Sequence, residues 1–289
     1  MAIPMQKLIP GVIPAYACPE GTKMHILNLG TLNVDEGWLL NGSNGGSASN
    51  PNPVNKRRDL MLIAGLIHHP EIGLILFECG ATEDVQTEWG NEATDLFPRT
   101  SYSEQHHLPA AIKSAGYEIK DVKAVIMGHL HLDHAGGLDH FRNTGVPIHV
   151  HEEEFKHACW AAATNSDSGL YLPLLEARWH VKLADIQRYP VRLVYRNYFV
   201  PLPGTYPGLC IMQVNLPNDG TFIWTTDQYH VRENFELNWA HGWLLRDYRS
   251  WLSSGNFIRR LQKAFSAKLI FGHDYSTADE LIKSKNYYN

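Results

Sequence analysis

The feature that most constrains this chain is a run of potential metal ligands, HLHLDH, at residues 129–134. It follows Val122–Met127, an apolar stretch that is typical of a buried strand. In an extended backbone, residues two apart share a face, so His129 and His131 are expected to point into one cavity. The aspartate and histidine that end the run lie where the chain turns and can face a second position nearby. Imidazole nitrogens with a carboxylate oxygen suit Zn²⁺ or a similar divalent ion.

Two other apolar stretches also end in potential metal ligands. Asp227 follows FIWTT at 222–226, and His273 follows LIFG at 269–272. Taken alone, the aspartate could cap a turn and the histidine could be an ordinary surface residue. Ligand sites gather at the ends of strands, and three such ends in one chain favour a shared site over both alternatives. At such a site the carboxylate of Asp227 could bridge two cations.

The composition is that of a globular protein with a full core, since 44% of the 289 residues are hydrophobic and 19% are charged. The net charge of −5 indicates no basic face, so we expect a small-molecule substrate and no nucleic-acid partner. Sixteen histidines add weight to a metal site without establishing one. The chain shows neither a membrane-spanning apolar run nor a secretory leader, and its four cysteines lack CxxC spacing. We therefore expect a cytoplasmic monomer or homodimer with reduced thiols.

The order of apolar stretches predicts two sheets with helices outside them. Strands are expected at 24–32, 38–40, 60–68, 74–78, 122–127, 147–151, 192–200, 209–216, 221–225 and 268–271. Helices are expected at 108–116, 152–163 and 243–265. Strands followed by helices, twice over, are typical of a four-layer αββα sandwich in the α/β class. We expect residues 1–289 to form a single domain.

The segment MGHLHLDHAGG at 127–137 resembles the signature of the metallo-β-lactamase superfamily. Within that superfamily the chain is similar to the N-acyl-homoserine-lactone lactonases and related hydrolases of small lactones. The likeness extends over most of the chain. FGHD at 271–274 is similar to the last ligand motif, and RENF at 232–235 to the segment after the bridging aspartate. FECG at 77–80 stands where the family has an Asp-Thr-Gly-like turn.

This resemblance implies the metallo-β-lactamase fold and two zinc ions, about 3.5–4 Å apart as in other two-metal sites. By analogy the ligands are His129 and His131 for the first ion, Asp133, His134 and His273 for the second, and Asp227 between them. A bridging hydroxide would attack a carbonyl carbon whose oxygen is polarised by one metal. Asp133 would hold this nucleophile and later pass a proton to the leaving atom.

One departure from the family concerns the first ion. The family supplies a further histidine from a Pro-Gly-His-x-Pro-Gly loop, whereas this chain has Thr205 in the corresponding loop, PGTYPG at 203–208. A neutral hydroxyl is a much weaker zinc ligand than an imidazole. Three outcomes stay open: a water completes the first site, which we favour, another histidine replaces the missing one, or the site is often empty. Candidates for the replacement are His151, His180 and His230.

A second departure lies three residues after the bridging aspartate. The lactonases often have a tyrosine there that donates a hydrogen bond to the substrate carbonyl, whereas this chain has His230, preceded by Tyr229. An imidazole N–H could polarise the carbonyl in the same way, which would make His230 a catalytic residue beside Asp133. The alternative is an ordinary loop histidine.

The fold alone does not choose the substrate, because it serves the hydrolysis of lactams, lactones, thioesters and phosphodiesters. The local resemblance favours the opening of a small cyclic ester or amide, a lactone or γ-lactam. An acyl-homoserine lactone would imply quorum quenching, and an aromatic lactam or lactone would imply detoxification. Aromatic residues that could line the pocket are Trp160, Tyr229, Trp239 and Trp243, and for the three tryptophans the alternative is a place in the hydrophobic core. The alternative is a non-catalytic metal-binding or sensor protein with a degraded first site, which Thr205 favours.

Overall fold

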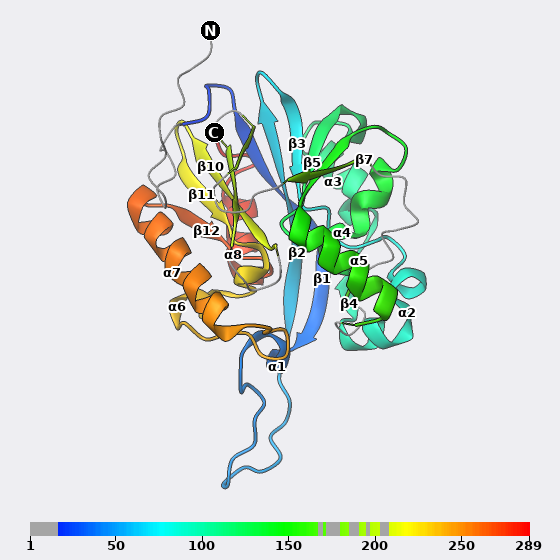
Figure 1. Cartoon of the computed structure of the whole chain (residues 1–289), viewed down its shortest axis with the longest axis vertical. Helices are drawn as coiled ribbons and strands as arrows, with labels where there is room; N and C mark the ends of the chain where they lie inside the picture. Colours follow the sequence, from blue (N-terminus) through cyan, green and yellow to red (C-terminus); the bar gives the residue numbers. More distant parts are fainter. Residues whose placement is uncertain (1–16, 167–169, 172–179, 185–190, 195–196, 203–207) are drawn as a thin grey trace.

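The computed structural model describes residues 17–166, 170–171, 180–184, 191–194, 197–202 and 208–289, and only the backbone within 180–201. In these residues two β-sheets pack face to face (Figure 1). The strands of the first sheet are, in order, β4 (Arg99–Ser101), β1 (Lys23–Asp35), β2 (Arg57–His69), β3 (Gly73–Phe77), β5 (Val122–Ile126), β6 (Pro147–His151) and β7 (His180–Ala184). Those of the second are β12 (Lys268–Ile270), β11 (Gly220–Trp224), β10 (Cys210–Leu216), β9 (Asn197–Pro201) and β8 (Val191–Val194).

The long strand β2 contributes to two separate cores, because side chains alternate between the faces of a sheet. Its Met61 and Ile63 belong to a buried cluster that also contains Phe222 of β11, in the opposite sheet. Its Leu62 and Leu66 belong to a second cluster, which includes residues of the outer helices. A strand that is buried on both faces has a nearly continuous apolar sequence, which is why this strand is predictable.

Helices cover the outer faces of both sheets (Figure 1). They are α1 (Glu36–Leu39), α2 (Val85–Leu96), α3 (Leu108–Ser114), α4 (Leu132–Ala135), α5 (Glu152–Thr164), α6 (Arg232–Glu236), α7 (Tyr248–Phe265) and α8 (Tyr275–Ser284). Ile112 of α3 and Ala158 of α5 are buried with residues of the first sheet, while Trp251 and Ile258 of α7 are buried with Ile223 of the second. The predicted four-layer αββα sandwich is therefore confirmed.

Two predicted strands were wrong in detail. Residues 38–40 overlap α1, a single helical turn that begins because the Asp35 side chain accepts the Gly37 N–H at 2.7 Å. The strand predicted at 192–200 is two strands, β8 and β9, which pair with each other antiparallel. Residues 41–55, whose Gly, Ser, Asn and Pro content predicts a loop, form a loop that extends beyond the sheets (Figure 1).

The remaining global expectations concern thiols and membranes. Cys18, Cys79 and Cys210 are buried, Cys159 is partly exposed, and none of these four cysteines is in a disulfide. Among the residues described here, no helix combines the length and the apolar character that a membrane span requires.

Candidate metal centre

The potential ligands come together from the ends of strands in both sheets. His129 follows β5 of the first sheet, while Asp227 follows β11 and His273 follows β12 of the second. All three side chains are buried. The Cys210 N–H at the start of β10 donates to the Gly128 carbonyl at 2.8 Å, which ties the loop after β5 to the second sheet. The strand ends that the sequence singles out thus converge on one place.

One oxygen of the Asp227 carboxylate faces two imidazoles. Its Oδ1 lies 3.2 Å from Nε2 of His134 and 3.1 Å from Nε2 of His273. These two nitrogens are themselves 3.1 Å apart. Asp133 adds a carboxylate, with Oδ2 3.5 Å from Nε2 of His273 and Oδ1 3.8 Å from Nε2 of His134. Asp133, His134 and His273, which the resemblance assigns to the second ion, form one group that could hold a cation.

The other carboxylate oxygen faces a second pair of imidazoles. Oδ2 of Asp227 lies 3.3 Å from Nε2 of His129 and 3.1 Å from Nε2 of His230. His131 completes a group with His129 and Asp227 in which the ligand atoms all lie within 4.8 Å of one another. This group holds the histidines that the resemblance assigns to the first ion. Asp227 stands between the two groups with one oxygen toward each, as a bridging ligand would.

The donor set fits divalent metal ions. Around tetrahedral zinc with ligands at about 2.0–2.1 Å, neighbouring ligand atoms lie roughly 3.3–3.4 Å apart. The nitrogen–oxygen distances around Asp227 are 3.1–3.3 Å. Oδ1 of Asp227 and both ring nitrogens of His230 are buried without a hydrogen bond to any described residue. Each such atom costs about 1–3 kcal/mol, a cost that a bound cation would remove.

The electrostatics of the first group favour cation binding. Burial alone would raise the pKa of Asp227, but the surrounding imidazoles, led by His230 and His134, hold that pKa well below its usual range. Burial, with a contribution from His129, holds the pKa of His131 well below its ordinary value. Ionised carboxylates and neutral imidazoles are the forms in which these side chains bind metal.

In the second group, protons compete with the metal. Burial lowers the pKa of His134, but Asp227, Asp133 and Glu78 more than reverse this and raise it well above its ordinary value. Burial also lowers the pKa of His273, but the charge of Asp227 outweighs this effect and the pKa is raised. Without a cation, the nearby carboxylates therefore favour the protonated form of these imidazoles. A metal ion would supply that positive charge instead, so its binding should release protons.

Glu78, which was not among the predicted site residues, supports the cluster from behind. Its Oε1 accepts the Gly128 N–H at 2.7 Å, and its Oε2 lies 2.9 Å from Nδ1 of His134. A carboxylate on Nδ1 directs the other ring nitrogen, here toward Asp227, as carboxylates do for metal-binding histidines. A Cβ at Gly128 would overlap Oε1 of Glu78, so this approach requires glycine. The signal that could have found Glu78 is its place in FECG, at the position of the family's Asp-Thr-Gly-like turn.

A second buried carboxyl, Glu154 in the first turn of α5, supports the loop between the two leading histidines. Its Oε1 accepts the Leu130 N–H at 2.8 Å. The side chain is fully buried, and burial raises its pKa to about 8. In the sequence Glu154 is one of three consecutive glutamates, and nothing in the pattern distinguishes it from the two others.

An apolar cavity opens on the cluster. Counted together with the open space at its mouth, it encloses about 440 Å³. Its apolar wall includes Leu32, Val34, Leu39, Leu60, Phe97 and Leu244. Its polar wall contains Asp133, His230 and other members of the cluster. The cavity therefore places a site that could activate a carbonyl group beside an apolar surface.

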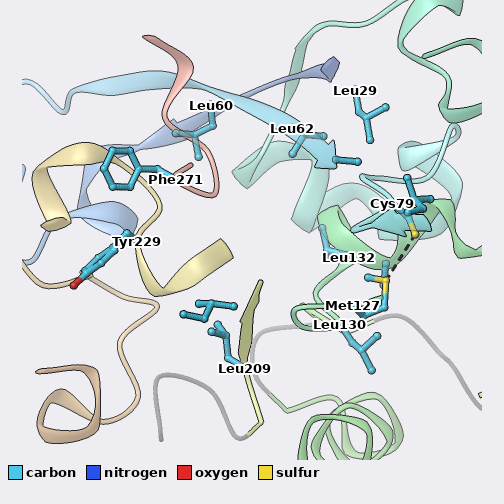
Figure 2. Packing of buried hydrophobic residues seen from close by; sticks show 14 of the residues in the cluster. Leu29, Leu60, Leu62, Cys79, Met127, Leu130, Leu132, Leu209, Tyr229 and Phe271 are labelled. Carbon is cyan, nitrogen blue, oxygen red and sulfur yellow. Dashed lines mark hydrogen bonds between the residues drawn. The ribbon is translucent and has the colours of Figure 1, made fainter. Parts of the chain in front are cut away.

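The four aromatic residues predicted for the pocket are not among the residues that line this cavity. Trp160 and Trp243 are 66% and 74% exposed, and Trp239 is 38% exposed. Tyr229 is fully buried in the hydrophobic core (Figure 2), where its ring packs edge-on against Trp251. The apolar wall consists instead of aliphatic side chains and Phe97.

The candidates for the missing ligand of the first ion are placed differently. Thr205 lies outside the described residues, and so does the side chain of His180. His151 caps α5, with Nδ1 accepting the Glu153 N–H at 3.1 Å. Of the three candidate histidines, His230 is the one whose ring is seen beside Asp227.

Imidazoles and carboxylates gathered around two positions of an αββα sandwich define a class, the metal-dependent hydrolases of this fold. Residues 64–273 match the family model of the Metallo-beta-lactamase superfamily, and the chain belongs to that superfamily.

Proteins that are similar to this chain include N-acyl homoserine lactonases. The chain is 25% identical to the N-acyl homoserine lactonase AiiB of Agrobacterium fabrum, over 91% of this chain and 98% of that protein. It is 27% identical to the N-acyl homoserine lactonase AttM of Azorhizobium caulinodans, over 78% and 86% of the two chains. A solved N-acyl homoserine lactone hydrolase with N-hexanoyl-L-homoserine at its catalytic metal centre superposes with a TM-score of 0.68 at 25% identity, over 91% and 96%. The predicted fold, family and metallo-hydrolase class are confirmed.

Proposed function

We propose that this protein is a metal-dependent lactonase that opens small lactones with an apolar substituent, and that N-acyl homoserine lactones are its substrate class. The observation that carries the proposal is the cavity, whose lining combines Leu39, Leu60 and Leu244 with the cluster residues Asp133 and His230. A lactone ring held at the cluster would lay its acyl chain against the leucines. Burial of each CH₂ group there would contribute about 0.8 kcal/mol.

The relatives support a lactone rather than a lactam as substrate. AiiB and AttM are N-acyl homoserine lactonases, and the solved hydrolase has its product N-hexanoyl-L-homoserine at the metal centre. A hexanoyl chain is an apolar substituent of the kind that an aliphatic wall accommodates. By this proposal the role of the protein is quorum quenching, and detoxification of an aromatic lactam is the weaker alternative.

In this mechanism two zinc ions would be held by the groups on either side of Asp227. When bound, such ions lower the pKa of a coordinated water to near neutrality and polarise a carbonyl oxygen. Asp133, whose side chain lines the cavity, would take the proton of the attacking water on a carboxylate oxygen. As the new C–O bond forms and the ring C–O bond breaks, Asp133 would return that proton to the ring oxygen, which yields the hydroxy acid.

A panel of N-acyl homoserine lactones and γ-lactams at neutral pH tests this function. We expect turnover of the lactones, with kcat/KM increasing with acyl length, and a loss of about 10²–10⁴-fold in Asp133→Asn. Asp139→Asn, which alters an exposed aspartate outside the cavity, is the matched control and should retain activity.

Two results would contradict the proposal in different ways. Turnover confined to γ-lactams would reject the lactone and retain the hydrolase. No turnover at all from a zinc-loaded, folded chain would favour the non-catalytic metal-binding or sensor protein.

A further inference from the structure

Each oxygen of the Asp227 carboxylate faces two imidazoles. On one side, Oδ1 lies 3.2 Å from Nε2 of His134 and 3.1 Å from Nε2 of His273. On the other side, Oδ2 lies 3.3 Å from Nε2 of His129 and 3.1 Å from Nε2 of His230. His230 therefore stands to Oδ2 as His273 stands to Oδ1, although it belongs to none of the three metal-ligand motifs of the sequence.

The ring of His230 is buried and held from two sides. It is 2% exposed. His241 lies edge-on to it, with ring centroids 4.2 Å apart, and its own Nε2 bonds to the Gln228 carbonyl at 3.1 Å. The ring of His273 is stacked on the same imidazole, 5.8 Å away and inclined by 15°. The backbone is also fixed, since the His230 carbonyl accepts the His273 N–H at 2.9 Å. Confined in this way, the ring keeps Nε2 toward Asp227.

We propose that His230 is a metal ligand, which gives the first ion a third imidazole nitrogen beside His129 and His131. The inference rests on the metal centre of the proposed function and adds a ligand to it. Neither ring nitrogen of His230 makes a hydrogen bond to a described residue, although Nε2 lies within ion-pair distance of Asp227. The 3.1 Å separation is close to the roughly 3.3–3.4 Å between ligand atoms of tetrahedral zinc.

This geometry favours ligation over the polarising role expected from the sequence. Nε2 of His230 faces the carboxylate oxygen that also faces His129, which is the orientation of a ligand, so a polarising N–H would have to come from Nδ1. Ligation also accounts for Thr205, because the nitrogen that the sequence lacks at position 205 is present at position 230. Three imidazole nitrogens and one carboxylate oxygen are a donor set that suits Zn²⁺.

Zinc binding by variants of His230 tests this assignment. Chelator-treated protein is titrated with Zn²⁺ by calorimetry, and zinc per chain is measured by elemental analysis after gel filtration. The wild-type chain should bind about two ions. His230→Ala and His230→Gln should retain about one, with affinity for the other lower by more than about 100-fold, because even the loss of a supporting residue costs 10–100-fold. The larger glutamine keeps the test valid if alanine unfolds the chain, and circular dichroism checks folding of both.

His151→Asn is the matched control. It removes a rival imidazole, and asparagine still caps α5, so this variant should bind two ions as the wild-type chain does. Two ions of unchanged affinity in folded His230 variants would overturn the assignment, as would a wild-type chain that binds one ion only. If the second ion depends on His230 but no lactone is hydrolysed, the proposed function fails and the ligand assignment stands.

Discussion

At the scale of single residues, the cluster depends on buried carboxyl groups behind the loop at 129–134. Glu78 holds His134 and the Gly128 N–H, and Glu154 holds the Leu130 N–H. The residues assigned as ligands could be predicted because each follows an apolar strand. Glu154 could not, because its role depends on α5 packing against a loop more than twenty residues earlier, which local sequence does not encode.

Glu154 should make stability depend on pH. Its pKa of about 8 in the folded chain lies above the ordinary value of 4.5. The folded state therefore binds this proton more tightly than the unfolded state. The free energy of unfolding should fall as pH rises from about 4.5 to 8, by at most about 1.4 kcal/mol per pH unit. Glu154→Gln mimics the neutral acid and keeps an acceptor for Leu130, so it should gain stability over the wild-type chain across this range.

Urea unfolding of the wild-type chain and of Glu154→Gln at pH 5, 6.5 and 8 measures the difference between their free energies of unfolding. Groups that titrate in both chains contribute equally and cancel in this difference. Glu153→Gln is the matched control. The carboxylate of Glu153 is next to Glu154 in the sequence but exposed, so its removal should leave the pH profile of stability unchanged. Parallel profiles for Glu154→Gln and the wild-type chain would show that Glu154 is ionised in the folded state.

At the scale of elements, strands buried on both faces could be predicted because they are continuously apolar, as in β2 and β3. The helix predicted at 243–265 begins later, at Tyr248, because the Asp247 side chain accepts the N–H groups of Arg249 and Ser250. The single turn α1 was missed, since one capping aspartate outweighs the strand propensity of the residues that follow it. In both cases a side chain that caps the backbone sets the boundary.

The turn after β12 should tolerate no side chain at Gly272. A Cβ there would lie 2.7 Å from Oδ1 of Asp227 and from the Thr226 carbonyl. Gly272→Ala should therefore destabilise the chain by about 1–3 kcal/mol and lower its zinc content, as overpacking displaces the carboxylate. Gly145→Ala is the control for zinc content: a Cβ there meets nothing within 4 Å, but the φ of +77° strains an alanine, so this variant should lose stability and keep its zinc. Full zinc content and an unchanged melting temperature in Gly272→Ala would refute this packing.

At the scale of the whole molecule, the cavity is assembled from distant parts of the chain. Leu32 of β1, Leu60 of β2, Phe97 after α2 and Leu244 before α7 meet at its wall. No local pattern marks these residues, because each reads as an ordinary core position. The convergence of ligands could be predicted from strand ends, whereas the wall of the pocket required the tertiary structure, and the aromatic residues chosen from composition lie elsewhere.

The measurement that tests the account most directly is the metal dependence of lactone hydrolysis. Turnover of N-hexanoyl homoserine lactone is followed in the purified chain, after removal of metal with a chelator, and during stepwise return of Zn²⁺. We predict that turnover falls to the uncatalysed rate without metal and is fully restored at about two ions per chain. A metal-free chain that still hydrolyses the lactone, or a folded chain that zinc does not reactivate, would contradict the account.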